Sequence, residues 1–295
     1  MTPAAKFRSQ MREGRTIWAA GAYDAMSGRL IGDAGFDAVL TSGFGVSASY
    51  LGQPDAELYT MTENLAVVRN VVGATSVPVV ADVDTGYGNP INVMRTVREF
   101  EQAGVAAMII EDQVSPKRCP ICVDQVEIIT LEEGVAKIRA AAAARRNPDT
   151  VIIARTDAID QDEAMRRGKA YADAGADIIQ PISKTFKDAA GLKRMREACG
   201  KRLSLQILGW LERDLTRQDI EAVAAIATYP LVPLMTVAAA LRKNLEALAA
   251  AKSSKNLPLP VMGHNDFLNF IGFPAIEKLQ VEYLQPAQTT TCAAE

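Results

Sequence analysis

Short apolar segments alternate with longer amphipathic segments along most of the chain. The short segments are apolar almost throughout, which is typical of strands covered on both faces. The longer segments repeat apolar residues at helical spacing. We expect strands at 16–21, 37–42, 77–83, 105–111, 150–155, 176–181, 203–208 and 225–229. We expect helices between them, near 24–34, 61–73, 90–103, 131–146, 160–174, 187–199, 215–223 and 232–251.

This order of elements predicts an α/β fold. Strands that are each followed by a helix, eight times over, are typical of a (β/α)8 TIM barrel, and a doubly wound parallel sheet is the alternative. Segments 33–43, 102–112 and 173–183 also resemble one another, because in each a helix ends, a Gly supplies its cap and an apolar strand begins. In a barrel, the residues after the strands converge on one rim, where active sites form.

One predicted strand ends in two carboxylates. Asp82 and Asp84 follow the apolar residues 77–80, and because side chains alternate along a strand they point to the same side. Gly86 and Gly88 then permit a tight turn. Two like charges at the end of an apolar strand need a positive partner, and Mg²⁺ prefers such oxygen ligands. Solvated aspartates in a capped turn are the alternative.

Polar residues also follow the neighbouring strands. They are Tyr23, Asp24, Ser42, Glu111, Asp112, Arg155 and Asp157. In a barrel they would share a rim with the two aspartates, which favours the metal site. Asp112 and Asp157 have an alternative role as helix caps or salt-bridge partners.

Two predicted loops beside this rim are longer than barrel connections usually are. The first, 42–61, contains Asp55. The second, 113–129, contains Lys117, Arg118 and Cys119. A long loop that carries two cations and a thiol next to a site is suited to supply catalytic groups. A surface loop with solvated charges is the alternative.

The composition is that of an ordinary globular protein, with 295 residues, 48% hydrophobic and 23% charged. The net charge of −3 argues against nucleic acid as a partner. No apolar run approaches the ~18 residues of a membrane span, and residues 1–15 lack the apolar core of a signal peptide, so we expect a cytoplasmic protein without a membrane partner. Cys119 and Cys122 have a CxxC spacing, but the single histidine leaves a zinc site short of ligands.

The C-terminal region predicts an association surface. Residues 249–256 are small and polar, as in a linker, and 261–284 then carry many aromatic and aliphatic residues. Such residues after a complete barrel need a burial surface, and docking on a neighbouring subunit is one solution. We therefore expect a barrel domain at 1–251, a helical segment that packs on another subunit at 252–285, and a disordered tail at 286–295.

Four segments resemble a known superfamily. Residues 82–89 (DVDTGYGN), 111–119 (EDQVSPKRC), 151–157 (VIIARTD) and 229–231 (YPL) are similar to the phosphoenolpyruvate mutase/isocitrate lyase superfamily. The resemblance is greatest to the branch with 2-methylisocitrate lyase, dimethylmalate lyase and the phosphonomutases. It implies a barrel whose last helix swaps between subunits, usually in a homotetramer. It also implies Mg²⁺, with Mn²⁺ as a substitute, acting on a small carboxylate or phosphonate substrate through an enolate.

The resemblance implies roles for individual residues. Asp84 resembles the direct Mg²⁺ ligand. The residues that resemble holders of metal-bound waters are Asp82, Asp55 and Glu111. The residues that match the substrate-binding set are Ser42, Gly43, Phe44 and Arg155, with Tyr23 on the same rim. Those on the family's gating loop are Lys117, Arg118 and Cys119. In the lyases, the loop cysteine gives or takes the proton at the carbon released by cleavage.

The chain also departs from the lyase pattern. Pro120 and Ile121 replace a Gly-His pair, and Ile182 stands where the lyases carry Glu. The lyases also carry an Asn after the seventh strand, and this chain has no clear equivalent of it near Gln206. These changes remove partners for further substrate carboxylates, so we expect an oxaloacetate-like or 2-alkylmalate-like acid and a C–C lyase. The alternatives are a phosphonomutase or phosphonopyruvate hydrolase that acts on a P–C bond, and a non-catalytic metal- and keto-acid-binding protein.

Overall fold

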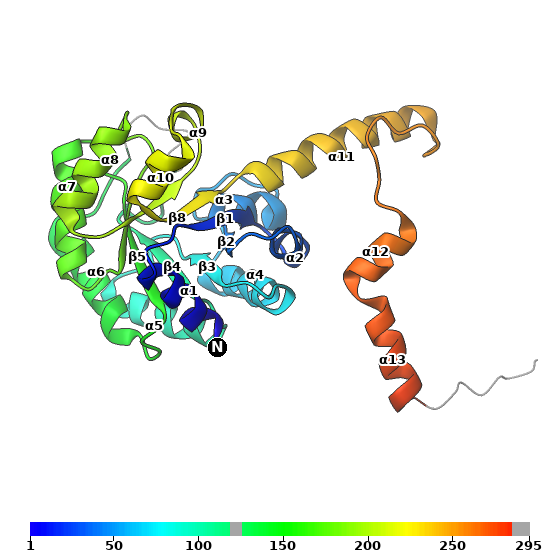
Figure 1. The fold of residues 1–295 in the computed structure, drawn as a ribbon, viewed down its shortest axis with the longest axis horizontal. Helices are drawn as coiled ribbons and strands as arrows, with labels where there is room; N and C mark the ends of the chain where they lie inside the picture. The colour runs from blue at the N-terminus through cyan, green and yellow to red at the C-terminus, as the bar shows by residue number, and fades with distance from the viewer. Residues whose placement is uncertain (119–125, 285–295) are drawn as a thin grey trace, which may run out of the picture. The chain divides into compact units, whose positions relative to one another are not determined.

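The computed structural model describes residues 1–118 and 126–284, and its first compact unit, residues 1–236, contains a closed barrel of eight parallel strands (Figure 1). The strands pair in chain order, and the last pairs with the first. Their bounds are β1 Ile17–Ala22, β2 Ala38–Thr41, β3 Val79–Asp82, β4 Ala107–Glu111, β5 Val151–Thr156, β6 Ile178–Pro181, β7 Leu203–Gln206 and β8 Ala224–Tyr229. All eight predicted strands are present, so the predicted TIM barrel is confirmed.

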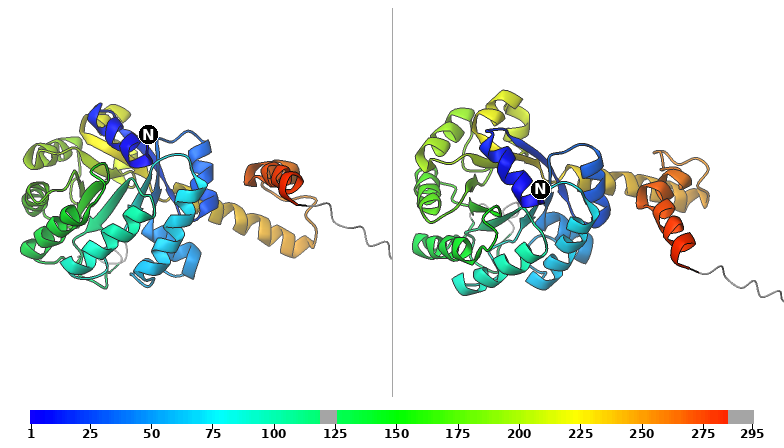
Figure 2. Two further views of the ribbon diagram at one scale, coloured as in Figure 1. Left: turned by 90° about the horizontal axis from the view of Figure 1, so that it is seen from below. Right: turned by 60° about the horizontal axis from the view of Figure 1, so that its bottom comes forward.

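Helices surround the strands (Figure 2). Those that match predicted ranges are α2 Ala25–Asp33, α4 Met61–Ala74, α5 Pro90–Gln102, α6 Leu131–Ala144, α7 Gln161–Asp173, α8 Ala189–Cys199, α10 Arg217–Val223 and α11 Val232–Ala251. In the described part of the chain, four elements were not predicted: α1 Pro3–Arg12, α3 Gly43–Val46, the π-helix η1 Ser47–Leu51 and α9 Trp210–Asp214.

Helix α1 packs against the end of the barrel where the strands begin. Thr2 caps it, since the Thr2 hydroxyl accepts a hydrogen bond from the Ala5 amide at 3.2 Å, and Pro3 suits its first turn. Phe7 is fully buried in the cluster that contains Ile17 and Ile153. The helix therefore fills the end of the barrel opposite the predicted active-site rim.

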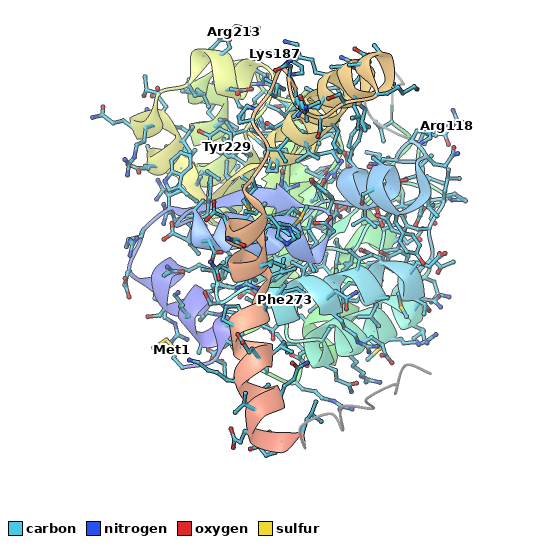
Figure 3. All side chains as sticks on the ribbon, turned by 90° about the vertical axis from the view of Figure 1, so that its right-hand side faces the viewer. Met1, Arg118, Lys187, Arg213, Tyr229 and Phe273 are labelled. Atoms are coloured by element: carbon cyan, nitrogen blue, oxygen red, sulfur yellow. The ribbon has the colours of Figure 1, made fainter. Side chains whose placement is uncertain are left out.

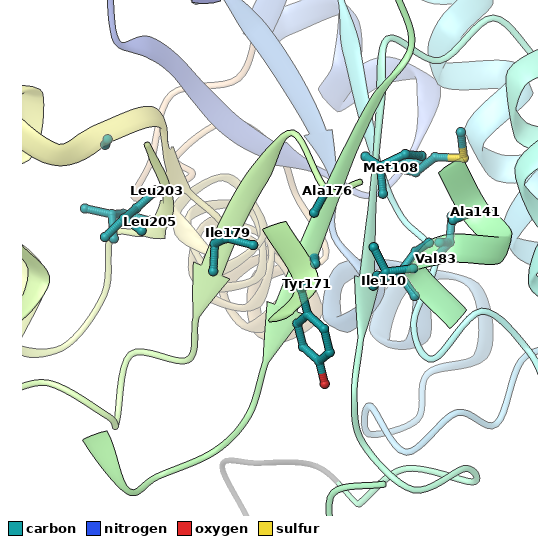
Figure 4. Packing of buried hydrophobic residues seen from close by; sticks show 14 of the residues in the cluster. Val83, Met108, Ile110, Ala141, Tyr171, Ala176, Ile179, Leu203 and Leu205 are labelled. Carbon is teal, nitrogen blue, oxygen red and sulfur yellow. The ribbon is translucent and has the colours of Figure 1, made fainter. Parts of the chain in front are cut away.

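Strand alternation divides the core into an inner and an outer layer. On β4, Ile109 belongs to the inner cluster, whereas Met108 and Ile110 pack outward with helix residues such as Ala141 (Figure 4). By the same alternation Glu111 points into the barrel. The strand register therefore decides which polar residues at the rim face the site.

The second compact unit begins at residue 237, within α11, and contains α12 His264–Ile271 and α13 Phe273–Tyr283. Its helices bury none of their residues, and Phe273 is 55% exposed. Helix swapping and the predicted boundary at 251 remain predictions, and the predicted tail at 286–295 lies outside the described residues. In the described part of the chain, no helix combines the length and apolarity that a membrane crossing requires.

Candidate active site

The turn after β3 places its second carboxylate in the interior. Asp84 has φ 48°, in the left-handed region that is uncommon for residues other than Gly, and Gly86 follows with φ 83°. The Asp84 amide donates to Asp82 Oδ1 at 3.2 Å, and the Asp84 carbonyl accepts from the Glu111 amide at 2.9 Å. The turn is thus fastened to β4, and Asp84 is completely buried.

Three residues that sequence analysis missed hold Asp84 in place. Tyr59 Oη and Tyr87 Oη donate to Asp84 Oδ2 at 2.7 and 3.1 Å. Asn64 Nδ2 donates to Tyr87 Oη at 2.7 Å and to the Asp82 carbonyl at 2.9 Å. Burial, together with the charge of Asp84, raises the pKa of both tyrosines well above 10.0, so each stays a hydrogen-bond donor at neutral pH.

The ammonium of Lys117 lies among the predicted metal-binding carboxylates. Lys117 Nζ is 3.1 Å from Asp55 Oδ1 and 3.6 Å from Glu111 Oε1, and it contacts Asp84 Oδ1 directly. Its side chain is only 2% exposed. Burial lowers the pKa of Lys117, but the surrounding carboxylates outweigh burial and raise it well above 10.5. Lys117 therefore carries a positive charge at the centre of the cluster.

Two carboxylates of the cluster are difficult to ionise. Burial and the charge of Asp84 raise the pKa of Asp82 to about 6. Burial raises the pKa of Glu111 to about 8, although Arg155 and Lys117 act in the opposite direction. A further positive charge would favour the ionised form of both groups.

The residues present fit a hard divalent cation. Asp55, Asp82, Asp84 and Glu111 supply only oxygen donors, as Mg²⁺ prefers. Among the described residues, Asp55 Oδ1 and both Glu111 oxygens are buried, and their partners are the ion pairs with Lys117 and Arg155 alone. Within the same residues, no group of three or more such side chains is arranged to hold an ion directly. Mg²⁺ commonly keeps several waters, and one direct carboxylate ligand with the others acting through water, as the superfamily resemblance implies, remains a prediction.

Arg155 extends from β5 toward the same cluster. Its Nη1 is 2.8 Å from Glu111 Oε2, its register partner on β4, and its Nη2 donates to Asp157 Oδ1 at 2.7 Å. Its Nε is buried and has no partner in the described chain. Since the two Nη groups are bound to carboxylates, Nε–H is a donor left for a ligand.

Asp112 supports the site from outside the barrel. It accepts hydrogen bonds from the Asp157 amide at 2.8 Å, from Tyr171 Oη at 2.8 Å and from Arg167 Nη1 at 3.1 Å. Asp112 and Asp157 are thus both salt-bridge partners, which was the alternative considered from the sequence. Asp112 thus fixes the backbone of Asp157, and the Asp157 carboxylate in turn holds Arg155.

Glu57, another residue missed in the sequence, joins the two long loops to the β3 turn. Its carboxylate accepts from Thr85 Oγ1 at 2.8 Å, from Ser115 Oγ at 2.9 Å and from the Lys117 amide at 2.8 Å. These bonds position the backbone from which Lys117 reaches the cluster.

The predicted carboxylate-binding segment lies beside the cluster. Ser42 caps α3, the Gly43 amide donates to Asp82 Oδ2 at 3.2 Å, and Phe44 lines the cavity. A Cβ on Gly43 would lie 2.7 Å from Tyr59 Oη, so only Gly fits there. Tyr23 does not line this cavity; it packs beneath the segment, where a Cβ on Gly45 would lie 2.9 Å from Tyr23 Cβ.

Arg118, from the same predicted loop, does not join the cluster. Arg118 is 63% exposed at the surface, 3.3 Å from Glu127 (Figure 3). Cys119 and Cys122 lie outside the described residues, and their predicted roles remain predictions.

A cavity of about 290 Å³ opens at the C-terminal end of the strands. One half is lined by residues that follow or end β2, β3 and β5, including Ser42, Asp82 and Arg155. The other half is lined by residues that end or follow β6, β7 and β8. A concave site at this end of a barrel, with buried and perturbed carboxylates, is typical of an enzyme active site.

Comparison with known proteins agrees with the geometry. The phosphoenolpyruvate phosphomutase family model matches residues 7–249. The chain belongs to the phosphoenolpyruvate mutase/isocitrate lyase superfamily. It is 41% identical over 288 residues to the 2,3-dimethylmalate lyase of Eubacterium barkeri, covering 96% of this chain and 99% of that protein. The resemblance described from the sequence is therefore confirmed.

Other members of the superfamily are also similar to this chain. The phosphonopyruvate hydrolase of Variovorax sp. (strain Pal2) is 36% identical over 77% of this chain and 79% of its own. A crystal structure of phosphonopyruvate hydrolase with oxalate and Mg²⁺ has a TM-score of 0.87 at 30% identity, covering 97% of this chain and 100% of that one. A 2,3-dimethylmalate lyase structure has a TM-score of 0.86 at 29% identity, covering 97% of each chain.

Proposed function

We propose that this chain is a Mg²⁺-dependent lyase that cleaves a C–C bond in a small 2-hydroxy or 2-keto carboxylic acid. The observation that carries the proposal is the largely buried cluster of Asp55, Asp82, Asp84 and Glu111, which Arg155 contacts through Glu111. Similarity to a 2,3-dimethylmalate lyase over almost the whole chain supports C–C cleavage.

The carboxylates of the cluster would hold the metal. Asp84 is the proposed direct ligand, because two tyrosine hydroxyls bind its Oδ2 while its Oδ1 faces the cluster, where the ion would replace the ammonium of Lys117 as its partner. Asp55, Asp82 and Glu111 would bind its water ligands. When bound, the ion would supply Lewis-acid stabilisation of negative charge on substrate oxygens, and Mn²⁺ would serve as a substitute.

Arg155 and the segment from Ser42 to Phe44 would bind the substrate. Arg155 Nε–H is a buried donor without a partner in the described chain, and Ser42 offers a hydroxyl at the cavity wall. Both suit a carboxylate oxygen. The salt bridges of Arg155 to Glu111 and Asp157 fix the guanidinium plane, so substrate binding needs little reorganisation.

The lysine and cysteine of the second loop would handle charge and protons. Lys117 is placed to stabilise negative charge near the cluster. Arg118 would act only after moving inward, since its side chain is exposed. Cys119 would transfer the proton at the released carbon, a role implied by the superfamily resemblance. Cys119→Ser should then lower turnover strongly, and unchanged turnover would refute this role.

Turnover of a substrate panel tests the proposal. The purified protein is incubated with 2-hydroxy acids, 2-keto acids and phosphonopyruvate, with Mg²⁺ or with EDTA, and products are followed by ¹H and ³¹P NMR. We expect C–C cleavage of at least one acid, abolished by EDTA and restored by Mg²⁺. Phosphate release from phosphonopyruvate alone would favour the phosphonopyruvate hydrolase alternative. Thermal stabilisation by an acid plus Mg²⁺ with no turnover would favour a binding protein.

The second compact unit would mediate self-association, as a tetramer by analogy with the superfamily. Its apolar side chains Phe273, Ile276 and Leu279 are each at least 50% exposed, which an isolated chain would rarely tolerate. Light scattering of the wild type and of Phe273→Lys tests this, with dissociation expected in the variant. A monomeric wild type at micromolar concentration would refute it.

A further inference from the structure

The two halves of the active-site cavity differ in charge. The half that β2 to β5 provide contains the cluster carboxylates Asp55 and Asp82 together with Arg155. The half that β6 to β8 provide contains Ile182, Leu208, Pro230 and Leu231, which we call the β6–β8 wall. Because the strands follow one another around a closed barrel, these sets lie on opposite sides of the cavity.

The polar groups near the β6–β8 wall are largely neutral and bonded to one another. Gln180 Oε1 accepts from Ser204 Oγ at 2.6 Å and from Gln206 Nε2 at 3.4 Å. Gln206 Oε1 is buried without a partner in the described chain and can accept only from a donor such as a hydroxyl. Among the described residues, Lys184 is the cationic side chain that lines this side. An anionic group here would have Lys184 as its cationic partner.

The charge of the whole site also disfavours a further anion. Two cationic side chains, Lys117 and Arg155, already contact carboxylates of Asp55, Asp84, Glu111 and Asp157. A divalent ion would bring the positive charges to four, against the five carboxylates of Asp55, Asp82, Asp84, Glu111 and Asp157, so no positive surplus would remain. A carboxylate head group would be held by direct contact with the ion and with Arg155 Nε–H, whereas a phosphonate or a second carboxylate against the opposite wall would have Lys184 as its cationic partner.

The wall is held rigidly in place. Trp210 Nε1 donates to the Ser183 carbonyl at 2.8 Å, and Thr185 Oγ1 donates to the Ala158 carbonyl at 2.8 Å, so the residues after Ile182 are tied to α9 and to the residues after β5. The Ile207 amide donates to the Thr228 carbonyl at 2.7 Å next to Leu208. Such a fixed apolar surface favours a ligand of matching shape.

We propose that the β6–β8 wall binds an uncharged, branched alkyl substituent of the substrate. At ~30 Å³ for each non-hydrogen atom, the cavity of about 290 Å³ has room for roughly ten such atoms. This is enough for a head group the size of oxalate and an extension of about four carbons. This inference rests on the proposed function for the position of the head group. Any carboxylate of the substrate then lies toward Arg155 and the metal-binding residues, and the substrate class is an alkyl-substituted 2-hydroxy or 2-keto acid.

Binding of matched keto acids tests the proposal without turnover. Calorimetry in the presence of Mg²⁺ measures the affinity for four acids. Oxalate and pyruvate report binding at the head-group site. The two longer acids are similar in length, but 4-methyl-2-oxopentanoate ends in a branched alkyl group and 2-oxoglutarate ends in a carboxylate. Burying apolar carbon strengthens binding by about fourfold per carbon, so we expect 4-methyl-2-oxopentanoate to bind at least about tenfold more tightly than pyruvate. We expect 2-oxoglutarate to bind no more tightly than pyruvate.

Two variants make the assignment specific to the wall. Ile182→Lys should bind 2-oxoglutarate more tightly than 4-methyl-2-oxopentanoate, the reverse of the wild type. Its affinity for oxalate should be unchanged, and this unchanged affinity also shows that the variant is folded. Ile91→Lys, at a site 73% exposed on α5, is the matched control and should change nothing. Preference for 2-oxoglutarate in the wild type that disappears in Lys184→Met would overturn the proposal.

The outcomes separate this inference from the proposed function. If neither oxalate nor pyruvate binds with Mg²⁺, the head-group site of the proposed function is wrong. If both bind and the alkyl extension adds less than about threefold, the head-group site stands and the role of the wall is wrong.

Discussion

Replacing Lys117 by Met tests whether its ammonium neutralises the carboxylate cluster. The substitution keeps an unbranched side chain but removes the charge that lies 3.1 Å from Asp55 and 3.6 Å from Glu111 and contacts Asp84. Removing one partner of a buried ion pair costs about 3–5 kcal/mol, because the other charge is left buried alone. In a domain of this size each kcal/mol shifts the melting temperature by ~2–4 °C, so the metal-free variant should melt roughly 6–20 °C lower.

Divalent metal should reverse much of this loss. An ion bound by the same carboxylates supplies the missing charge, and a ligand at about 100 times its Kd adds ~2.7 kcal/mol of stability. Differential scanning fluorimetry in EDTA and in saturating Mg²⁺ should therefore show a larger Mg²⁺-induced shift for Lys117→Met than for the wild type.

The neighbouring Arg118→Met is the control for Lys117→Met. Its 63% exposed side chain pairs with Glu127, and surface pairs contribute ~0–1 kcal/mol, so the melting temperature of the variant should stay within about 2 °C of the wild type. A Lys117→Met protein with the melting temperature of the wild type in EDTA would contradict this role of Lys117. So would a Mg²⁺-induced rise in its melting temperature that is no larger than that of the wild type.

Three further predictions concern single residues. Asp84→Ala should abolish Mg²⁺-dependent turnover, and a fully active variant would contradict its role as the direct ligand. Gly21→Ala should lower the free energy of unfolding in urea by about 3 kcal/mol, because its Cβ would lie 2.0 Å from the Pro230 carbonyl oxygen where β1 meets β8. Burial raises the pKa of Asp177, but hydrogen bonds from Arg8 and the Ile152 amide outweigh it and hold the pKa below 3.8. Its stabilisation is present above pH 3.8 and disappears as the pH falls through the lower folded-state pKa, so Asp177→Asn should cost about 2 kcal/mol in urea at pH 7 and converge with the wild type in acid.

The barrel could be predicted because its signal is local and repeated. Each strand is a short apolar run, as in Val151–Thr156, and each is followed by residues with helical spacing. Helix α1 lacks this signal, since only Ala4 and Phe7 of its residues are buried. The cap at Thr2 and the proline at position 3 were visible in the sequence, but without an apolar stripe they did not identify a helix.

The carboxylates of the site could be predicted for a similar reason. Asp82 and Glu111 end strands, and parallel strands in a closed barrel bring their C-terminal ends to one rim. Glu57 and Tyr59 could not be found in this way, because they come from an irregular loop and meet the site through contacts with distant residues. The bond from Glu57 to the Lys117 amide spans 60 positions, and no periodic pattern reports such a pair.

The carboxylate cluster and the β6–β8 wall bear on different parts of the substrate: the cluster on the head group, and the wall on the rest of the molecule. Similarity to a dimethylmalate lyase and to a phosphonopyruvate hydrolase over most of the chain shows that one scaffold accommodates cleavage of different bonds. A cluster suited to a metal and one carboxylate explains what such substrates share, but not how they differ. The difference must arise where the rest of the substrate lies, and there Ile182 and Leu208 offer hydrocarbon. A phosphonate or a second carboxylate against that surface would lose its hydration, with Lys184 as its cationic partner. We therefore expect the wall to determine substrate choice in this chain more than the metal-binding residues do.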